Sequence, residues 1–142
     1  MPWFPKQTVV APVDFSELSW EAVDTAMELA AQPSGVHVIH VLPVLEPAEP
    51  GVIWHTIDDE TRSRHAAQAV RERLADPKYK DVQIQIAFGD PGAEIADYAH
   101  KAGADLIVLP SHGRTGISRF LIGSVAERVV RLAHCPVLVL RK

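Results

Sequence analysis

The chain has 142 residues, 47% of them hydrophobic and 23% charged, which is the composition of an ordinary globular domain, so we expect one domain over residues 1–142. Its 14 Lys and Arg against 18 Asp and Glu give a net charge of −4, which argues against a general nucleic-acid-binding protein but leaves room for a local anion site. A single cysteine excludes an internal disulfide, and no apolar run approaches the roughly 18 residues that span a bilayer. Residues 1–7 lack the features of a signal peptide, so we expect a cytoplasmic protein with no membrane contact.

The first third of the chain predicts two strands around a helix. Residues 8–11 form an apolar, β-branched run that is typical of a strand. Residues 16–31 predict a helix, because small and apolar side chains recur there at spacings of three and four. A second apolar strand is expected at 36–42, and the proline-rich segment 43–55 that follows predicts a loop or a lid.

The middle of the chain predicts a helix, an edge strand and a second helix. The helix is expected at 56–75, with Thr56 as its N-cap. Residues 82–86 alternate strictly between apolar and polar side chains, which is typical of a strand with one poorly covered face and favours an edge of the sheet. Asp90 followed by a proline is a strong helix start, so another helix is expected at 91–101.

The last third completes the pattern of alternating strands and helices. Residues 106–109 are continuously apolar, as in a central parallel strand that is buried on both faces, and a helix at 124–133 precedes a final strand at 136–140. Five strands alternating with four helices predict an open, doubly wound, Rossmann-like parallel sheet with helices on both faces. Ligands of such sheets bind beyond the strand ends where the strand order reverses, which directs attention to the loops after the first and fourth strands.

The loop after the fourth strand, P-S-H-G-R-T-G-I-S-R-F-L-I-G-S from Pro110 to Ser124, has features of an anion site. Its glycines let backbone N–H groups approach an anion, and the helix that begins near Ser124 offers unpaired N–H groups and the positive end of its dipole. Arg114 and Arg119 add local charge. The alternative is a turn before an ordinary helix, because Ser124 and Glu127 form an S-x-x-E capping box.

The loop after the first strand, P-V-D-F-S, places a carboxylate at a strand end. Asp14 could accept a hydrogen bond from a ribose hydroxyl or could simply cap the first helix. The Walker A loop and the dinucleotide-binding fingerprint are both absent from the sequence. No hydrolase, zinc-protease or adenylating-enzyme motif stands out either, so the sequence favours a binding protein over an enzyme.

Several of these motifs occur together in the same order along the chain. P-V-D-F-S follows the first strand, S-H-G-R-T-G follows the fourth, nine residues separate Gly113 from Gly123, and the chain closes on C-P-V-L-V-L. With these motifs the chain resembles the universal stress protein family over essentially its whole length. The resemblance implies a single domain of this family with a five-stranded sheet of order 3-2-1-4-5. It also implies an ATP site between the two loops in the members that bind nucleotide.

The family's binding motif, G-x-x-G, nine residues, then G-[ST], fits Gly113, Gly123 and Ser124, which the resemblance implies lie near the phosphates. Pro110 replaces the first glycine, and proline has no N–H to donate. The resemblance further implies that Asp14 holds the ribose and that the main chain of Val41 contacts adenine. The candidate nucleotide-binding residues are Pro12, Val13, Asp14, Val41, Pro110, Ser111, His112, Gly113, Arg114, Gly116, Gly123, Ser124 and Val125.

The resemblance therefore predicts a cytoplasmic stress-response protein that binds ATP or AMP, with or without Mg²⁺, as a regulatory ligand. Asp14 and a bound Mg²⁺ would support at most slow ATP hydrolysis. The alternative is a dimeric interaction module of the same fold that binds no nucleotide because of Pro110. The resemblance implies a homodimer through the last strand, at 136–141, and pairing with a second copy would also cover an apolar edge that is otherwise prone to aggregate.

A few side chains have two plausible roles. His112 could reach a phosphate or could brace its own turn. Trp54 could close over a base or could dock its loop on the body of the protein. His37 and His40 are expected to face the sheet or an interface, and Cys135 is expected to be a small buried side chain at the start of a strand.

Overall fold

The computed structural model describes residues 3–45, 58–112 and 122–141. Its elements are β1 (Val9–Pro12), α1 (Glu17–Leu29), β2 (Val36–Leu42), α3 (Asp59–Arg73), β3 (Gln83–Phe88), α4 (Pro91–Lys101), β4 (Leu106–Pro110), α5 (Ser124–Leu132) and β5 (Val137–Leu140), with 3₁₀ turns at Pro33–Gly35 and Pro77–Tyr79. In these ranges no helix is both long enough and apolar enough to cross a membrane.

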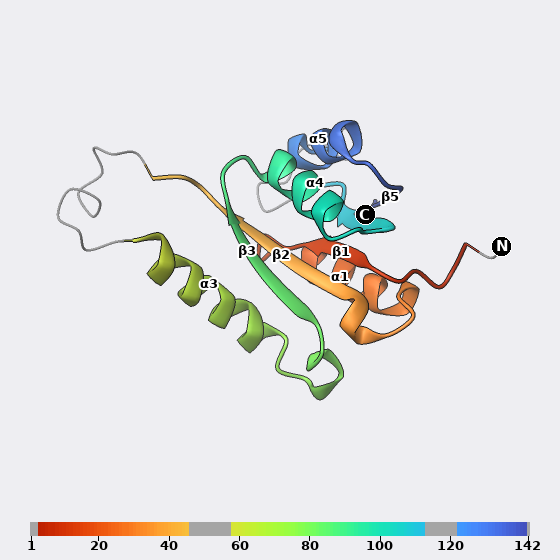
Figure 1. Ribbon diagram of the computed structural model, residues 1–142, viewed down its shortest axis with the longest axis horizontal. Coiled ribbons are helices and arrows are strands. Elements are labelled where there is room, and N and C mark those ends of the chain that lie inside the picture. Colours follow the sequence, from red (N-terminus) through yellow and green to blue (C-terminus); the bar gives the residue numbers. More distant parts are fainter. Residues whose placement is uncertain (1–2, 46–57, 113–121, 142) are drawn as a thin grey trace.

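The five described strands form one parallel sheet in the order β3-β2-β1-β4-β5, which confirms the predicted fold (Figure 1). β1 lies at the centre, where Val9 pairs with both Val36 of β2 and Leu106 of β4. The chain builds the sheet outward from β1 through β2 to β3 and then returns to the other side of β1 for β4 and β5. The strand order therefore reverses between β1 and β4.

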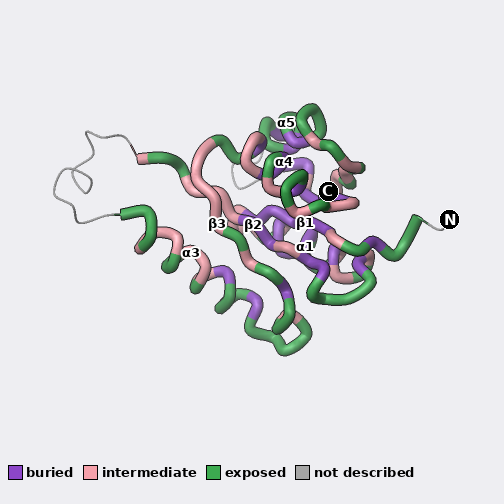
Figure 2. The backbone as a smooth tube through the Cα atoms, in the orientation of Figure 1, coloured by how far each residue is buried: buried purple, intermediate pink, exposed green. Residues whose placement is uncertain are grey.

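Two apolar layers cover the sheet, because its central strands carry apolar side chains on both faces. One layer holds the buried side chains of α1 and α3, including Trp20, Val23 and Val70, against β1, β2 and β4. The other holds those of α4 and α5, including Ile95 and Val129, against the opposite face. The buried segments in Figure 2 accordingly run through the central strands and the inward sides of the helices.

The starts of the helices follow their capping residues. α4 begins as expected, with Asp90 accepting a hydrogen bond from a first-turn N–H and Pro91 at the first position. The prediction for α3 is wrong, because its N-cap is Asp58 and not Thr56, which lies outside the described residues. The Asp58 carboxylate accepts the Thr61 N–H at 2.7 Å, and this bond lowers the pKa of the carboxyl group.

The edge position predicted for β3 is confirmed. β3 pairs only with β2 in the described sheet, and its polar side chains at Gln83 and Gln85 are exposed while the alternating Ile84 packs against the core. The strand is longer than predicted and continues to Phe88, which pairs with Leu42 at the end of β2.

α4 and α5 approach each other closely on their face of the sheet. A Cβ atom at position 92 would lie only 2.6 Å from the Cβ of Arg128, so glycine is needed there. The guanidinium of Arg128 then pairs with the carboxylate of Asp90 at 2.7 Å. α5 is thereby joined to the N-cap of α4 by both packing and charge.

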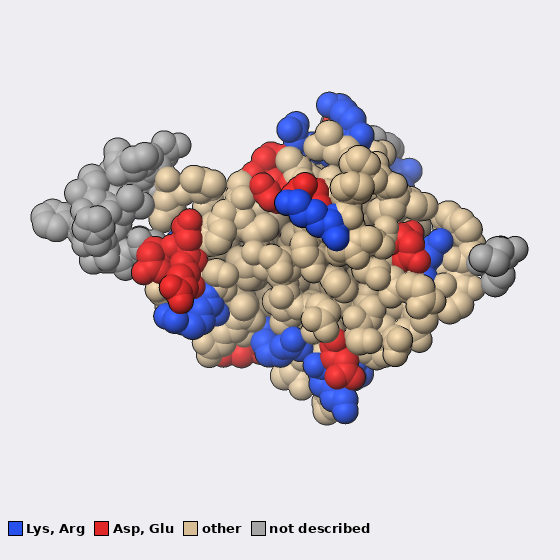
Figure 3. Space-filling view, in the orientation of Figure 1, with Lys and Arg blue, Asp and Glu red and all other residues tan. Residues whose placement is uncertain are grey.

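Charged side chains of both signs share the surface. In Figure 3 acidic and basic side chains lie next to one another in several clusters around a broad uncharged area. Exposed ion pairs such as Arg73–Glu17 at 3.3 Å and Lys101–Asp97 at 2.9 Å add little to stability, because solvent screens their charges. The stability of the fold therefore depends mainly on the two apolar layers.

Candidate functional site

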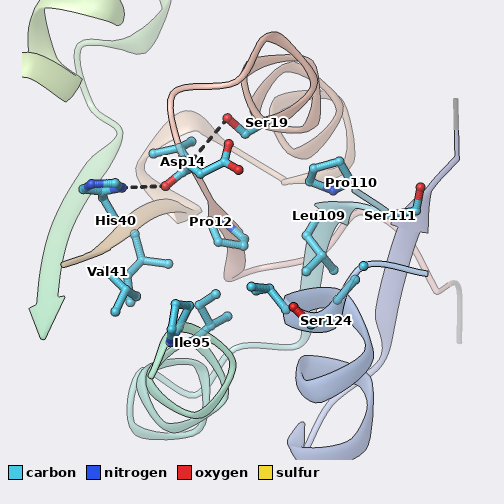
Figure 4. Close-up of a pocket in the computed structure, with 16 residues that line it drawn as sticks. Pro12, Asp14, Ser19, His40, Val41, Ile95, Leu109, Pro110, Ser111 and Ser124 are labelled. Atoms are coloured by element: carbon cyan, nitrogen blue, oxygen red, sulfur yellow. Dashed lines mark hydrogen bonds between the residues drawn. The ribbon is translucent and has the colours of Figure 1, made fainter. Parts of the chain in front are cut away.

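A pocket of about 270 Å³ opens at the carboxyl ends of β1, β2 and β4 (Figure 4). One wall is the turn after β1 together with the end of β2, and the opposite wall is the end of β4 together with the first turn of α5. α4 contributes Pro91 and Ile95. The pocket thus lies at the reversal of strand order, between the two loops to which the sequence directs attention.

The turn after β1 presents Asp14 at the pocket. The N–H of Val13 donates to the carbonyl of Ile39 at 2.8 Å, which extends the contact between β1 and β2 by one residue. Oδ1 of Asp14 then accepts hydrogen bonds from the N–H and the hydroxyl of Ser16, at 3.0 and 2.5 Å. Ser16 itself is the N-cap of α1, so the alternative of Asp14 as the helix cap is wrong.

Phe15 gives this turn an unusual backbone conformation. Its φ is +67°, a left-handed value that a bulky side chain adopts only when its surroundings hold it there. The ring packs edge to face against Trp20, with centroids 5.5 Å apart, and against His40, with centroids 4.9 Å apart. These aromatic contacts hold the residue next to Asp14 in place.

The end of β2 contributes Ile39, His40 and Val41 to the pocket. Nδ1 of His40 lies 2.7 Å from the carbonyl oxygen of Val13. His40 thus contacts the end of the neighbouring strand and also lines the pocket, a role that the sequence analysis did not assign to it. The sequence alone could not reveal this role, because a histidine near the end of a strand has the same local pattern whether or not it lines a pocket.

The opposite wall depends on a close approach between two backbones. The N–H of Ser111 donates to the carbonyl of Leu140 at 2.8 Å, which extends the pairing of β4 with β5. The carbonyl of Ser111 accepts the N–H of Gly123 at 2.6 Å. A Cβ atom at position 123 would lie 2.7 Å from that same carbonyl oxygen, so a glycine is needed here for an internal reason.

The predicted capping box at the start of α5 is wrong. Gly123 is the N-cap, Ser124 is the first helical residue, and no side chain caps the helix. The Glu127 carboxylate pairs with Arg131 instead of reaching back. The Ser124 hydroxyl forms no hydrogen bond with the described residues, so helix capping does not explain this serine.

His112 lies next to the pocket and not in its lining. Only 9% of the residue is exposed, and its Nδ1 lies 3.1 Å from the hydroxyl of Ser111. Its Nε2 is buried and has no hydrogen-bond partner among the described residues. The role of bracing its own turn thus uses one ring nitrogen and leaves the other available.

The remaining lining is largely apolar. The sequence reasoning identified Pro12, Val41 and Val125, and it missed Ile95 and Leu109. Leu109 follows directly from the apolar run before Pro110 and could have been found from its position. Ile95 could not, because its place depends on how α4 packs over the sheet. Pro91 of α4 was missed for the same reason, and Ser19 and Ala126 were missed because their places depend on the packing of α1 and α5.

Three candidate residues, Gly113, Arg114 and Gly116, lie outside the described residues, as does Trp54. In the described ranges no three His, Cys, Asp or Glu side chains gather as a metal site. Cys135 is only half-buried, in contrast to the expectation, and this burial, together with the negative charge of Asp105, raises the pKa of its thiol.

The sequence model of the universal stress protein family matches residues 6–141. The chain belongs to this family. Universal stress protein MJ0531 of Methanocaldococcus jannaschii is 37% identical over 141 residues, which cover 94% of this chain and 81% of that relative.

Solved structures share the same fold. The hypothetical protein MJ0577 has a TM-score of 0.74 at 26% identity, with 96% of both chains covered. A universal stress protein in complex with cAMP has a TM-score of 0.68 at 24% identity, covering 96% of this chain and 98% of that one. The universal stress protein of Archaeoglobus fulgidus in complex with dAMP has a TM-score of 0.58 at 23% identity, covering 94% and 96%.

The contact between Gly123 and Ser111 predicts a specific loss of stability. Gly123→Ala should lower the free energy of unfolding by about 1–3 kcal/mol, because the new methyl group meets a backbone carbonyl that cannot move away. Ser124→Ala is the matched control and should change stability by less than about 0.5 kcal/mol. Urea unfolding of both variants measures the difference. A loss of about 1 kcal/mol in Ser124→Ala would instead restore the capping role of the serine.

Proposed function

We propose that this protein, as a single universal-stress-protein domain, binds an adenine nucleotide, ATP or AMP, as a regulatory ligand in a cytoplasmic stress response. One observation carries the proposal: an apolar pocket has a carboxylate on one wall and the N-terminus of a helix on the other. These three features match the three parts of a nucleotide. The apolar surface suits the flat base, the carboxylate suits the hydroxyl groups of the sugar, and the helix N-terminus suits the anionic phosphate.

The apolar part of the pocket suits the base. Ile39, Val41, Ile95 and Leu109 offer apolar surface to a planar ring. Val41 lies near the end of β2, paired with Ala87 of β3, and its main chain would contact the edge of adenine. Pro12 and Val13 would line the same part of the site from β1.

The carboxylate of Asp14 suits the ribose. Two hydrogen bonds from Ser16 to Oδ1 fix the orientation of this carboxylate at the pocket wall. Ribose hydroxyls donate hydrogen bonds, and a carboxylate accepts them more strongly than a neutral group does. Asp14 would therefore select a sugar with free hydroxyl groups.

The first turn of α5 suits the phosphates. The N–H groups of Ser124, Val125 and Ala126 have no acceptor within the helix and lie at the positive end of its dipole. The Ser124 hydroxyl has no capping role, and the buried Nε2 of His112 has no hydrogen-bond partner in the part of the chain that the structure describes. In this proposal Ser111, Gly113, Arg114 and Gly116 complete the phosphate loop.

Mg²⁺ would enter this site only together with ATP. Of the described residues that line the pocket, Asp14 alone carries a carboxylate. Mg²⁺ is commonly held by one or two carboxylates and by substrate phosphates, so Asp14 and the phosphates would share it. With one carboxylate and no paired general base among the lining residues, we assign the nucleotide a regulatory and not a catalytic role.

The family supports this proposal. Two structures of the same fold hold cAMP and dAMP, which share the adenine base and a phosphate with AMP. Members of the family also carry the name of stress proteins, as MJ0531 of Methanocaldococcus jannaschii does.

One observation favours the alternative of an interaction module without nucleotide. Pro110 stands at the first glycine of the family motif and lines the same pocket as Ser124. Its nitrogen can donate no hydrogen bond to a ligand. In this alternative the dimer surface carries the function.

We also propose a homodimer in which β5 pairs with β5 of a second copy. β5 is an edge strand of the described sheet and shows Leu138 with 37% of its surface exposed. Antiparallel pairing across a two-fold axis would cover both edges at once.

The nucleotide proposal predicts that ATP or AMP is released when the freshly purified protein is denatured, or that it binds in calorimetric titration. Asp14→Asn should weaken binding by about 10- to 100-fold, because the ribose hydroxyls lose an ionised acceptor. Asp97→Asn, an exposed change on α4, is the matched control and should leave affinity unchanged. Flat titrations of the wild type to millimolar ligand would contradict the proposal.

Pro110→Gly separates the main proposal from its alternative. If proline only weakens an existing site, the variant should bind AMP about three- to tenfold more tightly than the wild type, because one hydrogen-bond donor is restored. Pro77→Gly in a remote turn controls for the flexibility that any proline loss adds. Binding by Pro110→Gly alone would establish the alternative, and no binding by either protein would assign the loop a structural role.

The dimer proposal predicts a two-fold mass in sedimentation at micromolar concentration. Leu138→Arg should shift the protein to the monomer, because a charge at an exposed position of β5 opposes strand pairing without disturbing the core. Gln83→Arg makes the same change on the opposite edge strand, β3, and should leave the dimer intact. A monomeric wild type would contradict this part of the proposal.

A further inference from the structure

The carbonyl of Val13 is held by a side chain at the point where β1 leaves the sheet. The register of β1 with β2 ends at Pro12–Ile39, and the N–H of Val13 makes one further bond to Ile39. The carbonyl of Val13 then meets Nδ1 of His40 at 2.7 Å, as the dashed line in Figure 4 shows. The imidazole of His40 thus bonds to the first carbonyl group beyond the main-chain pairing of β1 with β2.

The direction of this hydrogen bond is determined by its chemistry. A carbonyl oxygen can only accept, so the bond requires the hydrogen of a neutral His40 to be on Nδ1. Nε2 of the neutral ring is then an acceptor. His40 therefore has one assigned tautomer in this structure, and that tautomer follows from the position of Val13.

His40 also contacts Phe15, the residue that follows Asp14 in the sequence. The ring of Phe15 packs edge to face on the imidazole, with an interplanar angle of 84°. The same residue has the left-handed φ of +67° that turns the chain toward α1. Both neighbours of Asp14 in the sequence, Val13 through its carbonyl and Phe15 through its ring, are thus held by His40.

We infer that His40 is a positioning residue that holds the Val13–Asp14–Phe15 turn in its strained form and so aims the Asp14 carboxylate at the ribose of a bound nucleotide. This inference rests on the proposed nucleotide site and adds a residue that acts on the ligand through Asp14. Without the bond from Nδ1, the carbonyl of Val13 loses its side-chain donor and the left-handed turn loses one of its supports.

The first experiment measures AMP affinity by calorimetry in three variants. His40→Leu removes the donor and should weaken binding by about five- to tenfold. His40→Asn places an amide donor near the position of Nδ1 and should return the affinity close to the wild-type value. His37→Leu is the matched control on the same strand, because it removes an equally short bond, between Nδ1 of His37 and the Tyr98 hydroxyl, at a position that does not line the pocket.

A double-mutant cycle tests whether His40 acts through Asp14. In the Asp14→Asn background, His40→Leu should change AMP affinity little, because the group that it positions is already impaired. Additive losses would overturn the inference, and so would an unchanged affinity in His40→Leu. A similar loss in His37→Leu would mean that the effect comes from the fold in general.

The second experiment needs no nucleotide, so it separates this inference from the proposed function. Nitrogen chemical shifts of His40 in mildly alkaline buffer, where imidazoles are neutral, should show the hydrogen on Nδ1. The amide resonances of Asp14 and Ser16 should shift in His40→Leu and stay near their wild-type positions in His40→Asn. A hydrogen on Nε2, or unmoved resonances in His40→Leu, would overturn the inference. Correct shifts with no AMP binding would overturn only the nucleotide site.

Discussion

β1 and β4 are hydrogen-bonded neighbours whose chains leave the sheet toward opposite faces, and the candidate site depends on this divergence. After β1 the chain turns to α1 on one face, and after β4 it continues to α5 on the other. Two strands side by side cannot send their connections apart without leaving a gap beyond their ends. The pocket is that gap, and the residues that follow β1 and β4 form two of its walls, while the end of β2 and the start of α4 complete the lining.

Both walls are held by backbone carbonyl groups that accept an unusual partner. On one side the carbonyl of Val13 accepts from a side chain, His40, and on the other the carbonyl of Ser111 accepts the N–H of Gly123 from the next helix. The first bond joins the end of β1 to β2, and the second joins the end of β4 to the start of α5. The backbone that carries the Asp14 carboxylate and the first N–H groups of α5 is therefore held in place before a ligand binds. This reduces the conformational entropy that would be lost on binding.

The sequence predicts the fold better than it predicts the site. Alternation at 82–86 and continuous apolarity at 106–109 report burial directly, so the edge and central strands could be assigned from them. The spacing of Gly123 and Ser124 led to the correct wall, but the S-x-x-E pattern misassigned the cap, because only the contact with Ser111 decides where α5 begins. The positions of His40 and Ile95 in the pocket lining were not predicted, because they depend on which element packs beside each residue. Local sequence pattern carries no information about that packing.

The near contact of Gly92 with Arg128 has a mechanical consequence for the whole layer. With so little space between α4 and α5 and an ion pair from Arg128 to the cap of α4, the two helices form one closely packed plate over the face of the sheet that carries Val10, Ile39 and Ile107. That plate touches the pocket through Pro91 on one helix and Val125 on the other. A ligand that displaced the start of either helix would therefore press it against the other at Gly92 and Arg128, where there is no room for an added side chain.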